Sequence, residues 1–174
     1  MKQLLFLSTA ILLTACGDGK KEAAERMAQT EVAPPSGLVV DLAPHDVPFT
    51  LDLGDPGTLG TDSAEVRFNE EFGWVEVRAG ERCAMIIVEE PADLARLKAD
   101  LDRDMLQKHT VITETPELIV YRSQFPDSDL VYVHFLRVVN VAGRTFIVQD
   151  AQGPRFTEAD VERMSAAVRI PTNA

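Results

Sequence analysis

The segment Leu130 to Val141, LVYVHFLRVVNV, constrains the fold more than any other part of this sequence. Its β-branched, aromatic and aliphatic residues are typical of strands, and about twelve of them in succession predict a long central strand of a sheet. Side chains of a strand alternate between its two faces. Because apolar residues occupy both alternating sets, we expect other elements to cover both faces. The two sets are Val131, Val133, Phe135, Val139 and Val141 on one face, and Leu130, Tyr132, Leu136 and Val138 on the other.

A tight turn and a second strand follow this segment. Ala142 and Gly143 stand where the chain must reverse, and glycine tolerates the positive φ that a short hairpin turn requires. Residues 144–149 are therefore predicted to pair with the long strand in an antiparallel hairpin, which would form the nucleus of the sheet.

Several shorter segments also predict strands, because they alternate between apolar and polar residues or are rich in β-branched ones. Pro48 has no N–H to give to a ladder, so the segment 47–53 is expected at a sheet edge or beside a bulge. Short turns join the next three segments, which favours an antiparallel meander. Apart from a short apolar run at 38–42, the remaining strands are predicted at 65–69, 73–78, 82–88, 110–115 and 118–123.

Two segments show the period of an amphipathic helix. Pro91 and Asp93 favour the start of the first helix, whose apolar face is formed by Leu94, Leu97, Leu101 and Met105. In the second helix, Thr157 is the expected N-cap, and Asp160 three residues later completes a weaker form of the capping box. The buried stripe of this second helix is predicted at Val161, Met164, Ala167 and Val168.

The order of these elements, strands then helix and again strands then helix, predicts an α+β domain. We expect a mainly antiparallel sheet of about six to eight strands with two helices packed against it. From Leu38 onward, this order resembles the PsbP-like fold of several small bacterial lipoproteins and photosystem accessory proteins. The resemblance implies a binding or assembly role and assigns no catalytic residue.

The first fifteen residues have the features of a processing segment. Lys2 supplies a positive charge, and the apolar run that follows is about twelve residues, shorter than the roughly twenty needed to span a bilayer. Leu13-Thr14-Ala15-Cys16 then resembles the lipobox of bacterial lipoproteins, in which a signal peptidase cuts before the cysteine and the thiol carries a diacylglycerol. The resemblance implies that Cys16 is lipidated.

Three parts of the chain follow from these observations. Residues 1–15 are predicted to be a lipoprotein signal peptide, and residues 38–174 to be a single α+β domain. Residues 16–37 would comprise the lipidated cysteine and a flexible tether, because this stretch is polar, rich in small residues and ends in Pro34-Pro35-Ser36-Gly37.

Charge and the lipobox together indicate where the protein resides and what it contacts. The formal net charge of −11 disfavours nucleic acid and anionic lipid headgroups, so membrane attachment is expected through the acyl chains. In lipoproteins an Asp directly after the cysteine favours retention at the inner membrane, whereas Gly17 holds that position here. We therefore expect a bacterial cell-envelope protein at the outer membrane facing the periplasm, with an envelope protein as partner.

No known catalytic, cofactor or metal motif occurs in the sequence, so none of its residues is assigned to these roles. The histidines His45, His109 and His134 fall in a turn, at the predicted end of the first helix and in the long strand, and none has metal-ligand spacing. Asp100, Asp102 and Asp104 lack the other residues of a calcium loop. Cys83 lies among apolar residues, which favours burial of its thiol.

Two hypotheses about function follow from this sequence. The first is a membrane-tethered, non-enzymatic binding or assembly module. The second is an envelope enzyme or small-ligand-binding protein with a site around Tyr132, His134 and Arg137, whose side chains would have to line a common pocket. A convergence of Arg122, Arg137 and Arg144 on an anion is a further possibility, against which stands the pairing of these arginines with the many carboxylates.

Overall fold

The computed structural model describes residues 37–171 of the chain. The predicted signal peptide, Cys16 and the tether up to residue 36 lie outside the described residues. No helix within residues 37–171 is long and apolar enough to cross a membrane.

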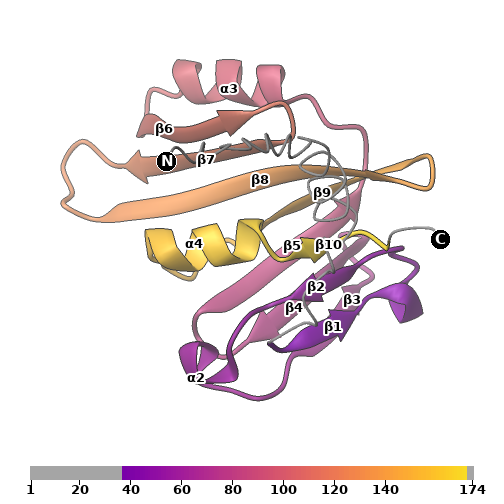
Figure 1. Cartoon of the computed structure of the whole chain (residues 1–174). Coiled ribbons are helices and arrows are strands. Elements are labelled where there is room, and N and C mark those ends of the chain that lie inside the picture. The colour runs from indigo at the N-terminus through magenta and orange to yellow at the C-terminus, as the bar shows by residue number, and fades with distance from the viewer. Residues whose placement is uncertain (1–36, 172–174) are drawn as a thin grey trace, which may run out of the picture. The chain divides into compact units, whose positions relative to one another are not determined.

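The main element is a seven-stranded antiparallel sheet with the order β3-β4-β5-β9-β8-β7-β6 (Figure 1). The predicted meander forms one half of the sheet, and the remaining strands form the other half. This arrangement confirms the predicted fold class. The strands are β3 (Glu65–Asn69), β4 (Trp74–Ala79), β5 (Cys83–Glu89), β6 (Lys108–Thr115), β7 (Leu118–Gln124), β8 (Val131–Val141) and β9 (Arg144–Asp150).

The predicted hairpin is formed by β8 and β9. Ala142 and Gly143 both have positive φ, 52° and 76°, and make the two-residue turn that the sequence predicts. β8 is paired on both sides, with β7 and β9, as expected of an interior strand. The middle position of the seven, however, belongs to β9 and not to β8.

A second sheet of three strands was not expected from the sequence. It consists of β1 (Val39–Asp41), β2 (Thr50–Asp52) and β10 (Val168–Arg169), with β2 in the middle. The ring of Phe49 meets the ring of Phe146 on β9 edge-on, with 5.5 Å between their centroids, so this small sheet packs on the main one. The predicted apolar face of the segment 47–53 is confirmed, because Val47, Phe49, Leu51 and Leu53 are all buried.

Helix α4 (Glu158–Ser165) packs against β8, β9 and β5 on the same face of the main sheet as the small sheet (Figure 1). Its predicted capping box is confirmed: the backbone N–H of Asp160 donates to Thr157 Oγ1, and that of Thr157 donates to the Asp160 carboxylate. Val161 and Met164 are buried as predicted. Val168 is also buried, but the helix has ended before it, and it pairs with Leu51 in β10.

Helix α3 (Leu94–Arg103) covers part of the opposite face, near β6 and β7, with its leucines half-buried. The prediction that its apolar face continues to Met105 is wrong. Asp104 adopts an extended backbone with ψ of 120° and ends the helix, so Met105 is 94% exposed. His109 consequently lies within β6 and not at a helix end.

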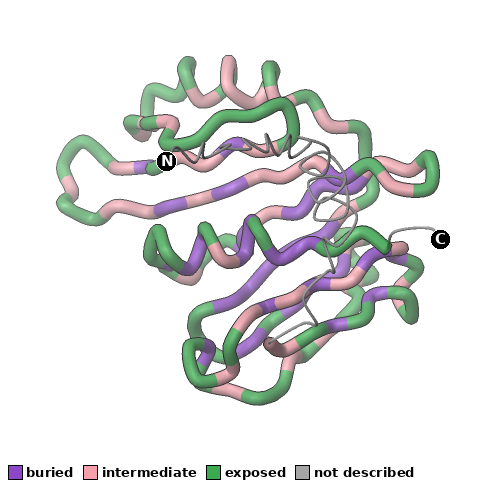
Figure 2. Tube along the Cα trace, in the orientation of Figure 1, coloured by how far each residue is buried: buried purple, intermediate pink, exposed green. Residues whose placement is uncertain are grey.

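The two faces of β8 are not equally covered, contrary to the prediction (Figure 2). Val133, Phe135 and Val139 are buried beneath α4 and the small sheet. Leu136 and Val138 on the other face are only half-buried, because α3 has just ten residues and covers that face incompletely. The remaining short elements are a 3-10 helix, Ala43–His45, and α2 (Pro56–Leu59).

Candidate ligand-binding site

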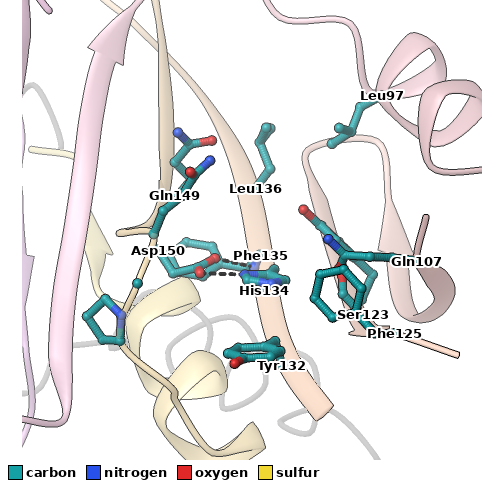
Figure 3. Close-up of a pocket in the computed structure, with 14 residues that line it drawn as sticks. Leu97, Gln107, Ser123, Phe125, Tyr132, His134, Phe135, Leu136, Gln149 and Asp150 are labelled. Atoms are coloured by element: carbon teal, nitrogen blue, oxygen red, sulfur yellow. Dashed lines mark hydrogen bonds and ion pairs between the residues drawn. The ribbon is translucent and has the colours of Figure 1, made fainter. Parts of the chain in front are cut away.

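A cleft of about 560 Å³ opens on the α3 side of the main sheet (Figure 3). Its floor is formed by side chains of β7 and β8, including Tyr121, Tyr132 and His134. Gln107, from the α3–β6 connection, and the segment 152–154, which follows β9, form its sides. The incomplete cover of this face of β8 therefore leaves space for a ligand.

The cleft lies where β8 and β9 separate. Leu136 and Gln149 are the last pair between these strands, whereas β9 stays paired with β5 as far as Asp150. Beyond this pair, the Asp150 carboxylate replaces the backbone carbonyl as hydrogen-bond acceptor: its Oδ1 accepts a hydrogen bond of 2.8 Å from the backbone N–H of Phe135. A buried N–H that loses its ladder partner needs such an acceptor.

Asp150 also fixes the ring of His134. Its Oδ2 lies 2.7 Å from His134 Nδ1. A dashed line marks this contact in Figure 3. An ionised carboxylate can only accept hydrogen bonds, so Nδ1 carries a proton and, in the neutral ring, Nε2 is an acceptor. The Asp150 side chain is 4% exposed and that of His134 is 25% exposed. The pair therefore has a buried carboxylate and a solvent-accessible imidazole.

Two tyrosines complete the aromatic floor. The ring of Tyr132 is nearly parallel to that of His134, at 7° with 6.4 Å between the centroids, and the Tyr121 centroid lies 5.3 Å from the imidazole. Burial, together with the nearby Asp150 charge, raises the pKa of Tyr121 to about 12. Tyr121 thus keeps its hydroxyl proton at neutral pH.

A second hydrogen-bonded series reaches the same cleft through Ser123. Ser123 Oγ lies 2.8 Å from His109 Nδ1, and His109 Nε2 lies 2.9 Å from Asp104 Oδ2. The hydrogen bond from His109 holds the pKa of Asp104 below its usual range. An ionised Asp104 accepts from Nε2–H, so in the neutral ring Nδ1 is free to accept from the serine hydroxyl. The groups that can activate a serine are therefore present in the order Ser123, His109, Asp104.

Of the three site residues predicted from the sequence, the structure brings two together. Tyr132 and His134 line the cleft, but Arg137 lies on the opposite face of β8, where its Nη1 donates to the Ser165 carbonyl at 2.6 Å. The physical reason is the alternation of side chains along a strand, which places residues 132 and 137 on opposite faces. The prediction that Tyr132, His134 and Arg137 line a common pocket is therefore wrong.

The three strand arginines do not converge on an anion site either. Arg122 pairs with Glu158 on α4. Arg144 binds the carboxylates of Glu89 and Asp46, at 2.6 and 3.0 Å. Arg122 and Arg144 thus pair with carboxylates, as the alternative interpretation expected, whereas Arg137 donates to a backbone carbonyl.

The surroundings of Cys83, Asp100 and Asp104 are explained by burial, ion pairs and backbone hydrogen bonds. Cys83 is buried as predicted, and burial raises the pKa of its thiol to about 11. In the predicted aspartate series, Asp100 lies near Arg96 and Arg103, and Asp104 accepts from the N–H groups of the α3–β6 connection. Among residues 37–171, no group of three or more histidine, cysteine or acidic side chains could hold a metal ion.

Comparison of the chain with protein-family models, curated proteins and solved structures found no match.

Proposed function

We propose that this chain is a lipid-anchored, non-enzymatic binding module of the bacterial cell envelope that holds a small ligand in the cleft beside His134. The observation that carries this proposal is the His134–Asp150 pair, which presents an oriented imidazole on an aromatic floor. The volume of the cleft is within the range of about 300–1,000 Å³ that is common for small-molecule sites.

The proposed ligand is a small planar compound with a hydrogen-bond donor. Tyr132 and Tyr121 offer ring faces and edges, against which an aromatic or heteroaromatic group can pack. His134 Nε2 would accept a hydrogen bond from an O–H or N–H of the ligand. The cleft is also lined by the amides of Gln107, Gln149 and Gln152, which can both donate and accept.

The proposed location in the cell envelope rests on the sequence alone. The lipobox at Leu13 to Cys16 supports anchoring through acyl chains, and Gly17 after the cysteine supports the outer membrane. The order of elements, which resembles PsbP-like proteins, supports a binding role and an envelope protein as partner. Replacing Cys16 with serine tests the anchor: incorporation of radiolabelled fatty acid should stop, and labelling that persists would exclude this site of lipidation.

Ligand binding can be tested with phenol and toluene, which differ by one hydrogen-bond donor. Titration of the full chain with phenol should shift NMR signals of Tyr132 and His134, and toluene should shift them far less. The variant His134→Ala should lose the preference for phenol, whereas His45→Ala, which alters a histidine outside this cleft, should keep it. Equal shifts with both compounds, or a preference that survives His134→Ala, would contradict the proposal.

A second candidate function is acyl transfer at Ser123, and the series Ser123–His109–Asp104 favours it. Ser123 Oγ would attack the carbonyl carbon of an ester while its proton passes to His109 Nδ1 and then to the departing alkoxide. Water would then hydrolyse the acyl-serine, returning the proton to Ser123 through His109. A fluorophosphonate probe decides between the candidates: labelling that disappears in Ser123→Ala but persists in Ser128→Ala supports the enzyme, and no labelling supports binding alone.

A further inference from the structure

Four large apolar side chains protrude from two connections beside the mouth of the cleft. Met105 and Leu106, in the α3–β6 connection, are 94% and 74% exposed, and Phe125 and Leu130, in the β7–β8 connection, are 45% and 47% exposed. We call these four residues the apolar rim. Singly exposed apolar residues are common on proteins, whereas a contiguous group indicates a surface that meets a partner.

The strand register brings the two connections together. Lys108, the first residue of β6, pairs with Gln124, the last residue of β7, and Gln124 pairs with Val131, the first residue of β8. The connections therefore emerge from three adjacent strands at the same end of the sheet (Figure 1). Phe125 also lines the cleft, so the apolar rim adjoins its mouth.

Hydrogen bonds hold both connections in defined conformations. In the first, Asp104 Oδ1 accepts from the N–H groups of Leu106 and Gln107, at 2.7 and 3.2 Å. In the second, the Gln124 side chain donates to the Ser128 carbonyl at 2.8 Å, and the Ser128 N–H donates to the Phe125 carbonyl at 3.2 Å. The chain thus keeps these side chains at the tips of ordered turns and does not fold them inward.

We infer that the apolar rim inserts into the interface of a zwitterionic phospholipid bilayer, so that the mouth of the cleft faces the membrane. Large apolar side chains such as those of Met105, Leu106 and Phe125 can be buried at the boundary between headgroups and acyl chains. Asp127 and Asp129 lie in the β7–β8 connection itself, and the formal net charge is −11, so an anionic bilayer would repel this surface.

The inference rests on the anchored state put forward under proposed function, because anchoring keeps the rim close to a bilayer. Residues 17–36 separate Cys16 from the described domain. About twenty residues can span at most roughly 70 Å when extended, so the anchor alone permits both a docked domain and one distant from the bilayer. Insertion of the apolar rim would favour the position in which the domain is docked on the bilayer.

Quenching of tryptophan fluorescence by brominated phospholipid tests this position. Trp74, in β4, is the only native tryptophan, so Trp74→Phe provides a background into which Phe125→Trp is introduced. The full chain, purified from bacterial membranes, is combined with an excess of phosphatidylcholine vesicles with or without bromine on the acyl chains. We expect strong quenching of the indole at position 125 and weak quenching of Trp74 in the otherwise native protein.

Matched variants and a flotation assay separate the rim from the anchor. Leu106→Asp should reduce quenching at position 125 at least about fivefold, whereas Ile170→Ser, at a site that is 49% exposed and outside the rim, should not. Vesicles with half anionic lipid should also give less quenching. Absence of quenching at position 125 in lipid excess overturns the inference, whether or not the protein floats with the vesicles. Failure to float, with quenching retained, overturns only the anchor.

Discussion

Asp150 joins the end of β9 to His134 on β8 after the backbone ladder between these strands has ended. Its carboxylate binds both the imidazole at 2.7 Å and the Phe135 N–H at 2.8 Å, and the side chain is 4% exposed. The Asp150 side chain thus links β9 to β8 where their backbones separate, and it orients the imidazole that is proposed to accept a hydrogen bond from the ligand.

Substitutions of Asp150 should distinguish these two contributions. Asp150→Ala leaves a buried N–H and an imidazole without their acceptor and should lower the free energy of unfolding by about 1–3 kcal/mol. Asp150→Asn keeps an oxygen for the Phe135 N–H and should cost clearly less. Urea unfolding curves provide the measurement, with Gln152→Ala on the exposed cleft side as control. Equal losses in both variants would contradict the role of the backbone acceptor.

The unequal faces of β8 predict unequal costs of truncation. Phe135 is 2% exposed, so Phe135→Ala should lower the free energy of unfolding by about 3–5 kcal/mol. Leu136 is half-buried beside the cleft, and Leu136→Ala should cost only about 1 kcal/mol. Denaturant melts of the two variants give the comparison. A Leu136→Ala cost as large as that of Phe135→Ala would mean that this face is closed in solution.

Glu76 should make stability depend on acid pH. Hydrogen bonds from Asn69, Arg67 and Trp74 lower the pKa of Glu76 from 4.5 to about 2. Because the folded pKa lies below the unfolded one, this stabilisation is present above about pH 4.5 and is lost as the pH falls towards 2. Unfolding free energies measured across this range should decline less steeply in Glu76→Gln. An unchanged slope would show that other carboxylates dominate.

Cys83 should resist thiol reagents while the domain is folded. Burial raises its pKa from 9.0 to about 11, so both access and thiolate are lacking at pH 8. Since the folded pKa is the higher one, the associated stabilisation is present below pH 9 and is lost as the pH rises towards 11. In a Cys16→Ser background, labelling should require denaturant. Rapid labelling of the native protein would contradict the burial.

Much of the fold follows from patterns that are local in sequence. The apolar run of β8, Gly143 at its turn, and Thr157 with Asp160 at the start of α4 each specify a structure within a few residues. The end of α3 does not follow from the sequence pattern, because Met105 continues the helical period, while the Asp104 carboxylate accepts hydrogen bonds from the next N–H groups and stops the helix. The spacing of apolar residues alone does not show that the Asp104 side chain competes with the helix for these N–H groups.

The candidate site depends mainly on pairing between distant segments, which the sequence does not specify. Asp150 and Ser123 were not singled out, since their partners become visible only when the strand register is known. The opposite orientations of Tyr132 and Arg137, in contrast, were available from the alternation along β8. Sequence reasoning thus found two residues of the cleft and missed the carboxylate that orients one of them.

The small sheet has a consequence for the order in which the protein can complete its structure. Val168 in β10 pairs with Leu51 in β2, so one edge of an early strand waits for a partner made near the end of synthesis. Contacts between such distant residues form slowly, because a long loop must close first. A partly synthesised chain that ends before Val168 therefore cannot complete the small sheet, and the free edge of β2 is paired only after the last residues of the domain have been made.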